Sequence, residues 1–358
     1  MINIAIFENL NSGGALNQVK NYIKYFNKLG YKVDIYTHTL NKMKLTNKIY
    51  YYPVSDPKNS FDEILKTINQ LKTSQHKIAD IINNKKYSLI LIFPCKFTQC
   101  PFLTKYIKNK NSYYFFLETK REFYENTTND YFFLKRIIAR AIRTPIKFID
   151  KSNCKNAEHI ISTSYYSRFV LEKIYNKKST VIYPNLKQIK TVRYKIKNQK
   201  KFLSVGLISK LKNNNFTIEL LKPLNQKLNL IGNYSNDTHK INYELYCKLF
   251  SNIDDREKIK RYKNNTFYMA NQINEPFGLT TLEAANYNNF VFGLNNGGTS
   301  EIIQNGLNGI LYPNKIHLAT KIINKYLNKK NLIVYKTCII NWETSVKKIL
   351  DFTHTPNA

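Results

Sequence analysis

Short apolar runs of strand length alternate with amphipathic stretches through the first half of the chain. The apolar runs lie at residues 2–7, 31–37, 88–94, 112–117, 159–164 and 179–185. Between several of them, apolar side chains recur every three or four positions, which is the period of a helix. The helical stretches run from Leu16 to Leu29, where Gly30 follows, and lie near 60–83 and 165–175. This alternation predicts parallel sheets with helices on both faces.

The second half of the chain repeats the alternation. Apolar runs lie at residues 202–206, 228–232 and 290–294, with a helical stretch around 214–222. The lysine-rich segment 186–201 between the two series is predicted to be a linker. A chain of 358 residues has room for two domains of about 150–200 residues each. We therefore predict an α/β protein with one domain at 1–185 and a second at 186–340.

The formal net charge of +32 is spread over the whole chain. Residues 1–180 hold 30 Lys and Arg against 13 Asp and Glu, so the positive excess is shared between the two halves. Only eight of the basic residues are arginines, whereas proteins that bind nucleic acid rely on arginine for bidentate contacts to guanine and phosphate. The composition therefore favours a chain-wide bias towards lysine, and no nucleic-acid partner is expected. Attraction to acidic surfaces follows from the charge in either case.

Half of the arginines fall within 23 residues: Arg121, Arg136, Arg140 and Arg143. On a helical wheel, the basic residues of 135–147 share one sector and the apolar residues of 134–148 fall largely on the other side. Such a helix can lie on an anionic bilayer, or it can cover a sheet with its basic side in water. Both interpretations stay open. Pro145 is expected to end or kink the helix.

The chain shows no signal peptide, because its first apolar run lacks a basic region before it and carries Glu8. No apolar run approaches the roughly 20 residues that a membrane-spanning helix needs. The cysteines are odd in number, scattered, and form no zinc-binding set: Cys95, Cys100, Cys154, Cys247 and Cys338. We expect reduced thiols in a cytoplasmic protein, with a peripheral position on the inner face of the membrane as an open alternative.

The segment 275–283, EPFGLTTLE, is the most informative part of the chain. Pro276 biases Glu275 towards an extended backbone, and the helix that begins near Gly278 carries Glu283. The backbone N–H groups of Phe277, Gly278 and Leu279 then form the anion-binding end of a helix. Two carboxylates beside an anion site suit a ligand with hydroxyls on both sides of a diphosphate, such as a nucleotide-sugar. A plain loop followed by a solvated helix face is the alternative.

The wider segment 264–313 resembles the C-terminal half of retaining GT-B glycosyltransferases of the family 4 type, the glycosyl transferases group 1. Glu275 and Glu283 match the E-x7-E signature of that family, and GGTSEII at 297–303 and NGLNGILYP at 305–313 follow in the family's order. The resemblance implies the GT-B fold, in which two Rossmann-like domains with parallel sheets face each other across a ligand-binding cleft. It also implies that the last segment, 341–358, returns as a helix to the first domain.

Other family motifs are matched in part. In the donor-phosphate segment SVGLISKLKNN, Gly206 and Lys212 match, but Leu207 stands where the family has an arginine. In the acceptor-side loop LETKREFYE, Glu118 and Arg121 match, but Leu117 stands at the histidine position. The family's loop that faces the donor diphosphate and the acceptor corresponds here to the turn with Gly13 and Gly14. We read GGTSEII mostly as structure near the site.

The resemblance also implies roles for the matched residues. Glu283 would hold the ribose diol and Glu275 the sugar hydroxyls. Lys212 and the backbone amides of the helix start would stabilise the departing diphosphate. Those amides belong to Phe277, Gly278, Leu279 and Thr280. Lys212 and Glu275 are the predicted catalytic residues. Retaining transfer would need no dedicated protein base, and because the chain has no Asp-x-Asp motif, no metal and no cofactor are expected.

The sequence therefore predicts a retaining hexosyltransferase of polysaccharide biosynthesis. Its donor would be a UDP- or GDP-sugar, and its acceptor a glycan or a lipid-linked molecule. A non-catalytic nucleotide-sugar or polyanion-binding protein on the same scaffold is the main alternative, because Leu207 and Leu117 depart from the family pattern. A nucleic-acid binder that uses the net charge is a third. The sequence leaves open the sugar, the nucleotide, the acceptor and the oligomeric state.

Overall fold

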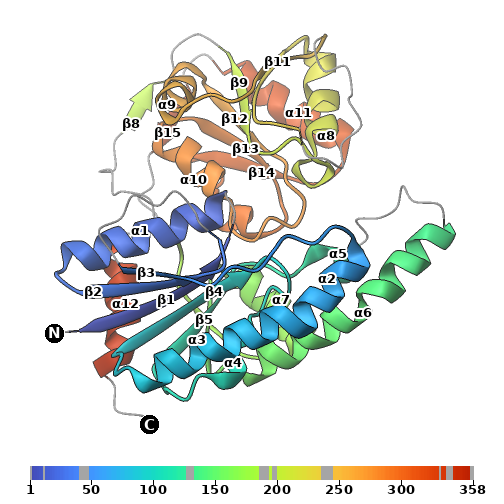
Figure 1. The fold of residues 1–358 in the computed structure, drawn as a ribbon. Helices are drawn as coiled ribbons and strands as arrows, with labels where there is room; N and C mark the ends of the chain where they lie inside the picture. Colours follow the sequence, from blue (N-terminus) through green and yellow to red (C-terminus); the bar gives the residue numbers. More distant parts are fainter. Residues whose placement is uncertain are drawn as a thin grey trace. The chain divides into compact units, whose positions relative to one another are not determined.

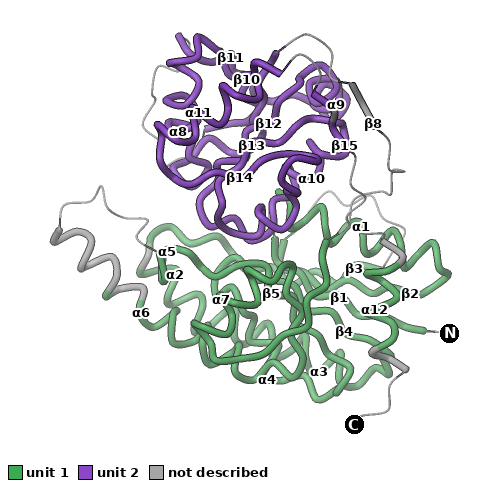
Figure 2. The backbone as a smooth tube through the Cα atoms, turned by 180° about the vertical axis from the view of Figure 1, so that it is seen from behind, with its two compact units in different colours: residues 1–185, 342–358 green, residues 186–341 purple. Residues whose placement is uncertain are grey.

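The chain divides into two units, which are described separately below. Unit 1 comprises residues 1–185 and 342–358, and unit 2 comprises residues 186–341 (Figure 2). The structure is a computed structural model. It describes residues 2–10, 13–39, 48–125, 133–184, 193–195, 200–234, 245–329, 332–335 and 342–354.

Unit 1 is built on a seven-stranded parallel sheet in the order β3-β2-β1-β4-β5-β6-β7. Its strands are β1 (Asn3–Asn9), β2 (Lys32–Thr37), β3 (Lys48–Tyr51), β4 (Leu89–Cys95), β5 (Ser112–Phe116), β6 (His159–Ser162) and β7 (Thr180–Val181). Register places Ile4 of β1 opposite Val33 of β2 and Leu89 of β4. The predicted strands are confirmed, although β7 is shorter than expected. The apolar pattern missed β3, because this edge strand is mostly exposed.

Helices cover both faces of this sheet (Figure 1). They are α1 (Gly14–Lys28), α2 (Ser60–Lys66), η1 (Thr67–Leu71), α3 (Lys72–Asn84), α4 (Leu103–Tyr106), α5 (Arg121–Tyr124), α6 (Phe133–Asn156), α7 (Tyr165–Tyr175) and α12 (Trp342–His354). Successive β1 side chains point to opposite faces. Ile4 therefore packs with α1 and with Val346 of α12, whereas Phe7 packs with Ile78 of α3. The side chain of Trp342, expected to anchor α12, lies outside the described residues.

Pro145 was expected to end or kink helix α6; the helix continues through it, so the proline does not end the helix, and the kink stays a prediction. The part beyond the proline is held by buried contacts: Asp150 accepts hydrogen bonds from the Cys100 amide at 2.9 Å and from the Tyr175 hydroxyl at 2.6 Å. Burial raises the pKa of Asp150 to about 7. Phe148, expected on the apolar side, is 67% exposed. The side chains that form most of the predicted basic sector lie outside the described residues.

Unit 2 has a six-stranded parallel sheet in the order β11-β10-β9-β12-β13-β14. Its strands are β9 (Phe202–Val205), β10 (Leu228–Ile231), β11 (Cys247–Phe250), β12 (Phe267–Ala270), β13 (Phe290–Leu294) and β14 (Gly309–Tyr312). The helices are η2 (Lys210–Lys212), α8 (Asn214–Leu221), η3 (Lys222–Leu224), α9 (Asp255–Asn264), α10 (Leu279–Asn286), η4 (Gly298–Glu301) and α11 (Ile316–Leu327). Phe202 packs with α8 and α11 on one face, and Leu203 packs with α9 and α10 on the other.

The two parallel sheets with helices on both faces confirm the predicted fold class. A small antiparallel pair joins β8 (Arg193–Lys195) to β15 (Ile333–Tyr335). Strand β8 lies inside the segment 186–201 that was predicted to be only a linker, so that prediction is wrong for these three residues. Among the described residues, no helix combines the length and the apolar character needed to cross a bilayer.

Candidate functional site

The candidate site of unit 2 lies at the carboxyl ends of three adjacent strands. Strands β9, β12 and β13 are neighbours in the sheet, and they lead into η2, into the loop before α10, and into η4. In parallel sheets, ligands bind at this edge because the loops after neighbouring strands meet there. The order of strands therefore brings Lys212, Glu275 and Gly297 together from positions up to 85 residues apart.

The loop after β12 and the start of α10 have the geometry that the motif predicted. Glu275 lies in the loop, and Glu283 is the fifth residue of α10. Gly278 precedes the helix with a φ of 98°, a conformation that glycine adopts without strain. No side chain caps the first turn of α10. Its N–H dipoles are therefore directed at a place where an anion can bind.

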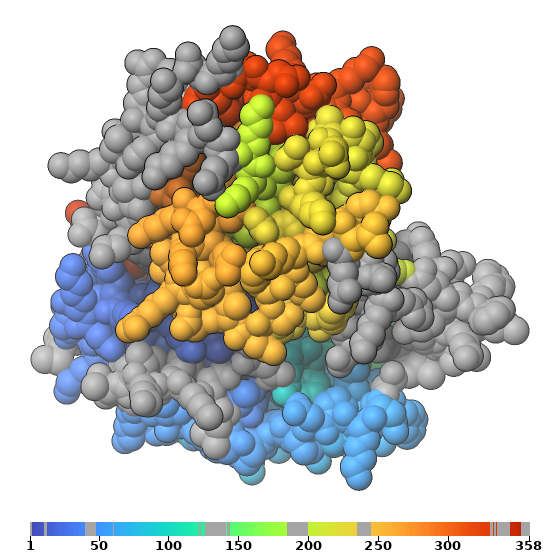
Figure 3. Space-filling view, turned by 90° about the horizontal axis from the view of Figure 1, so that it is seen from above, coloured from blue at the N-terminus to red at the C-terminus, as the bar shows by residue number. Residues whose placement is uncertain are grey.

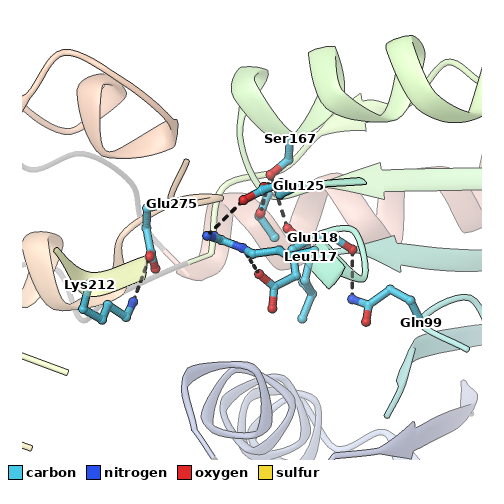
Figure 4. A network of polar contacts seen from close by, with 9 residues as sticks. Gln99, Leu117, Glu118, Glu125, Ser167, Lys212 and Glu275 are labelled. Atoms are coloured by element: carbon cyan, nitrogen blue, oxygen red, sulfur yellow. Dashed lines mark hydrogen bonds and ion pairs between the residues drawn. The ribbon is translucent and has the colours of Figure 1, made fainter. Parts of the chain in front are cut away.

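Lys212 and Glu275 form an ion pair in this site. The Lys212 Nζ donates to Glu275 Oε2 at 2.8 Å, and both side chains are only partly exposed (Figure 4). A backbone hydrogen bond joins the two segments that carry this pair: the Ile273 amide donates to the Leu211 carbonyl at 2.8 Å. The pair places one positive and one negative group beside the helix start. A phosphate and a hydroxyl are the ligand groups that such a pair can bind.

Glu283 is held by α9. The Tyr262 hydroxyl donates to Glu283 Oε2 at 2.9 Å, and Lys258 Nζ lies 3.7 Å from the same oxygen. Burial raises the pKa of Tyr262 well above its usual value, so the phenol keeps its proton and acts as a donor. The sequence analysis missed both α9 residues. The signal that could have found them is their spacing, since positions four apart share one face of a helix.

Glycines after β13 support the Glu275 loop directly. The Gly298 amide donates to the Glu275 carbonyl at 2.7 Å. A Cβ on Gly298 would come within 2.2 Å of the Pro276 carbonyl oxygen, and one on Gly297 within 2.6 Å of the Glu275 carbonyl oxygen. Backbone segments therefore touch here with no space for side chains. The segment GGTSEII, which was predicted to be mostly structure near the site, packs directly against the Glu275 loop.

Two buried threonine hydroxyls lie against Gly278. A Cβ at Gly278 would come within 2.7 Å of Thr299 Oγ1 and 3.3 Å of Thr281 Oγ1. Neither hydroxyl has a hydrogen-bond partner among the described residues. Buried polar atoms are usually paired, and these two lie next to the uncapped start of α10. Gly278 is thus required by its positive φ and by this close approach.

The segment after β9, which was predicted to bind the donor phosphate, also depends on a close backbone approach. A Cβ on Gly232, which follows β10, would lie 1.9 Å from the Gly206 carbonyl oxygen. The sequence analysis assigned no such role to Gly232. Leu207, at the family's arginine position, is 50% exposed. An exposed leucine supplies no charge to a phosphate.

In unit 1, the two glycines predicted in the turn before the first helix lie at its start, and the helix begins two residues earlier than Leu16. Gly13 has a φ of 92° and precedes the helix, and Gly14 is its first residue. No side chain caps this helix start either. The neighbouring positions 11 and 12 lie outside the described residues.

The acceptor-side motif of unit 1 is already engaged in ion pairs. Arg121 Nε donates to Glu118 Oε2 at 3.1 Å, and its Nη1 lies 3.9 Å from Glu125 Oε2. The Glu118 backbone carbonyl accepts a hydrogen bond from Gln99 at 2.9 Å (Figure 4). Leu117, at the family's histidine position, is buried in the apolar cluster under α1. An acidic acceptor that binds Arg121 has to compete with these carboxylates.

Within the part of the chain that the structure describes, no three His, Cys, Asp or Glu side chains gather as a metal site. The four cysteines of that part, Cys95, Cys100, Cys154 and Cys247, are free thiols and buried. Burial raises the pKa of Cys247 to about 11, which disfavours its thiolate.

This geometry agrees with a family comparison. Residues 185–339 match the family model of the glycosyl transferases group 1. The matched residues cover unit 2, including β9 to β14 and the site described above. No curated protein matches the chain.

Solved structures share the fold over nearly the whole chain. Sucrose-phosphate synthase from Thermosynechococcus elongatus superimposes with a TM-score of 0.68 at 13% identity, covering 99% of this chain and 98% of that one. TarM from S. aureus, crystallised with UDP and α-GlcNAc-glycerol among its ligands, gives 0.61 at 14% identity, with 99% and 100% covered. HepE from Anabaena, in complex with UDP and glucose, gives 0.57 at 14%, with 92% and 90% covered. The chain therefore has the GT-B fold, with two Rossmann-like units.

Proposed function

We propose that this protein is a glycosyltransferase that moves a hexose from a UDP- or GDP-sugar to a glycan or lipid-linked acceptor, with retention of anomeric configuration. The observation that carries the proposal is the Lys212–Glu275 ion pair beside the uncapped start of α10, the helix that also carries Glu283. This arrangement lies in the part of the chain that matches the glycosyl transferases group 1. Solved proteins of the same fold carry UDP with a sugar.

Each group has a role in the proposed reaction. The Glu283 carboxylate accepts hydrogen bonds from the ribose diol, and Glu275 accepts them from the sugar hydroxyls. Lys212 and the first-turn amides of α10 stabilise the negative charge that develops on the departing diphosphate. In retaining transfer of this kind, a phosphate oxygen of the leaving group takes the proton of the attacking hydroxyl. The protein then supplies electrostatic stabilisation and positioning, without a base of its own.

Lys212 has to exchange partners in this scheme. Its Nζ donates to Glu275 Oε2 at 2.8 Å. When a diphosphate binds, the ammonium group turns to the phosphate, and the Glu275 oxygen becomes available for a sugar hydroxyl. The two side chains are 27% and 19% accessible, so the cost of breaking the pair has to be offset by the new contacts to the phosphate and the hydroxyl.

We propose a cytoplasmic location, with an anionic membrane surface as a partner on its inner face. The net charge of +32 and the exposed Phe148 of α6 support this proposal. Sedimentation with vesicles that contain anionic lipid should show binding at low salt and release at high salt. Absence of binding at low salt would exclude the membrane as a partner.

A second candidate function is non-catalytic binding of a nucleotide-sugar or another polyanion. The exposed Leu207 and the buried Leu117 favour it, because both stand where the family has a charged or titratable group. A missing charge-assisted hydrogen bond is worth roughly 1.5–3 kcal/mol, or about ten- to a hundredfold in affinity. Such a loss weakens a donor site without abolishing it. Turnover of a nucleotide-sugar distinguishes the two candidate functions, because only the glycosyltransferase would show it.

Calorimetric titration with UDP, GDP, their monophosphates and their hexose conjugates tests the proposed function. We expect saturable micromolar binding of one diphosphate and slow release of that diphosphate from the matching sugar conjugate. Lys212→Met should weaken diphosphate binding by about tenfold, with a smaller effect on the monophosphate, because it removes a charge-assisted contact. Lys227→Met, at an exposed position of unit 2, is the control and should bind like the wild type. Binding without turnover supports the second candidate. No binding to any nucleotide rejects both.

A further inference from the structure

Helix α9 contributes the two groups that hold the Glu283 carboxylate. It lies at the surface of unit 2 (Figure 3), and its Asp255 side chain is 90% exposed. Asp254 caps the helix by accepting a hydrogen bond from the Glu257 amide at 2.7 Å. One face of α9 nevertheless points inward, because Tyr262 is fully buried. Lys258, one turn earlier on the same face, reaches the same carboxylate.

Both α9 groups act on a single oxygen of Glu283. Tyr262 and Lys258 contact Oε2, and Oε1 makes no hydrogen bond or ion pair with the described residues. The Glu283 side chain keeps 24% of its surface exposed. A carboxylate has about four acceptor positions. The contacts to Oε2 therefore leave Oε1, and the second lone pair of Oε2, to accept hydrogen bonds from hydroxyl groups.

The tyrosine is itself immobilised. Its ring stacks on Tyr287 with centroids 5.4 Å apart, and the Asn289 side chain donates to its backbone carbonyl at 2.9 Å. The hydroxyl has one proton, and its other acceptor among the described residues, the Thr280 carbonyl, is 3.4 Å away. The Tyr262 hydroxyl therefore donates its hydrogen bond to Glu283, the nearer of the two acceptors. A rigid donor restricts the carboxylate to one rotamer before any ligand binds.

Lys258 adds charge to this arrangement. Burial lowers its pKa, but the Glu283 and Asp255 carboxylates outweigh that effect and raise it above the usual value. The lysine is therefore charged at neutral pH and faces the Glu283 carboxylate as a cation. At 3.7 Å from Oε2, it contributes less than the tyrosine hydroxyl at 2.9 Å.

We propose that Tyr262 and Lys258 are positioning residues that make this site select ribonucleotides over deoxyribonucleotides. The inference rests on the proposed function, in which Glu283 accepts the ribose diol. A carboxylate held in one orientation accepts both hydroxyls with little ordering cost, and a mobile one does not. The two α9 residues then act only on ligands that present the diol. Their removal should weaken the binding of a ribonucleotide and leave unchanged the binding of a nucleotide that lacks both hydroxyls.

The test compares UDP or GDP, whichever the wild type binds, with its 2′,3′-dideoxy counterpart. In the wild type, the dideoxy nucleotide should bind at least about tenfold more weakly. Tyr262→Phe keeps the ring and removes only the hydroxyl. It should weaken ribonucleotide binding by about tenfold and leave the dideoxy nucleotide within about twofold. Lys258→Met should act in the same direction, by about threefold, since the contact is longer and partly exposed.

Two controls separate positioning from loss of structure. Tyr312→Phe removes another buried hydroxyl, which donates to Asn271 at 2.7 Å, and Lys260→Met removes a charge from an exposed part of α9. Both should keep the wild-type preference for the ribonucleotide. If Tyr262→Phe weakens both nucleotides equally, or neither, the positioning role is wrong while the proposed function stands. If the wild type binds neither nucleotide, the proposed function fails, and this inference fails with it.

Discussion

Glu283→Ala should lower the affinity for the nucleoside diphosphate by about a hundredfold or more. The substitution removes both acceptors proposed for the ribose diol, and each hydrogen bond to a charged group is worth roughly 1.5–3 kcal/mol. It also leaves the buried Tyr262 hydroxyl without its 2.9 Å partner. This separate effect should lower the free energy of unfolding by about 1–3 kcal/mol. Calorimetric titration measures the first effect and urea unfolding the second.

The matched control for this prediction is Glu219→Ala. Glu219 is an exposed glutamate on α8 of the same unit, so its loss should change neither affinity nor stability by more than about 0.5 kcal/mol. Wild-type affinity in Glu283→Ala would contradict the role of this carboxylate. A loss of stability with unchanged affinity would make Glu283 a structural residue only.

The second large effect is expected for Gly298→Ala, although this glycine carries no side chain that could touch a ligand. The added methyl group would meet the Pro276 carbonyl oxygen at 2.2 Å and the Phe277 Cα at 2.8 Å. Both are backbone atoms of the loop between Glu275 and α10, and a backbone cannot yield as a flexible side chain does. Overpacking of this kind costs roughly 1–3 kcal/mol. Because the loop must shift, we also expect about tenfold weaker nucleotide binding, the equivalent of about 1.4 kcal/mol.

Gly306→Asn is the comparison for this glycine. Gly306 has a φ of 82°, and a Cβ there would have no neighbour within 4 Å. Asparagine tolerates that backbone conformation. Urea unfolding and calorimetry should therefore give values close to the wild type. Equal losses in the two variants would show that close packing on the Glu275 loop does not explain the effect at Gly298.

Much of the fold could be predicted from the sequence because its strands are buried. In a parallel sheet covered on both faces, a strand reads as a continuous apolar run, as at 89–95. The strands that were missed are β3, β8, β11, β12, β14 and β15. Two of them have local reasons. The edge strand β3 is mostly exposed, and β12 stands directly before the candidate-site loop in a polar context. Helix α9, with its strongly polar sequence, carries too few apolar residues to show a pattern.

The candidate site could be predicted only in part. The sequence placed Glu275 in a loop and Glu283 on a helix, because proline and glycine restrict the backbone locally. The pairing of Lys212 with Glu275 across 63 positions was not predicted from spacing. The ion pairs of Arg121 with Glu118 and Glu125 were not predicted either. Contacts of this kind depend on side-chain directions that local sequence does not specify.

By itself, the sequence determined the alternation of strands and helices, the parallel sheets and the local conformation of the 275–283 motif. These features follow from the period of apolar residues and from the restricted backbone of Pro276 and Gly278. Only the tertiary structure decided which distant groups surround the motif. The order of strands β9, β12 and β13 brings Lys212 and Gly298 to the Glu275 loop. The packing of α9 on α10 aims the Tyr262 hydroxyl at Glu283, because a buried phenol must find an acceptor and this carboxylate lies within its reach.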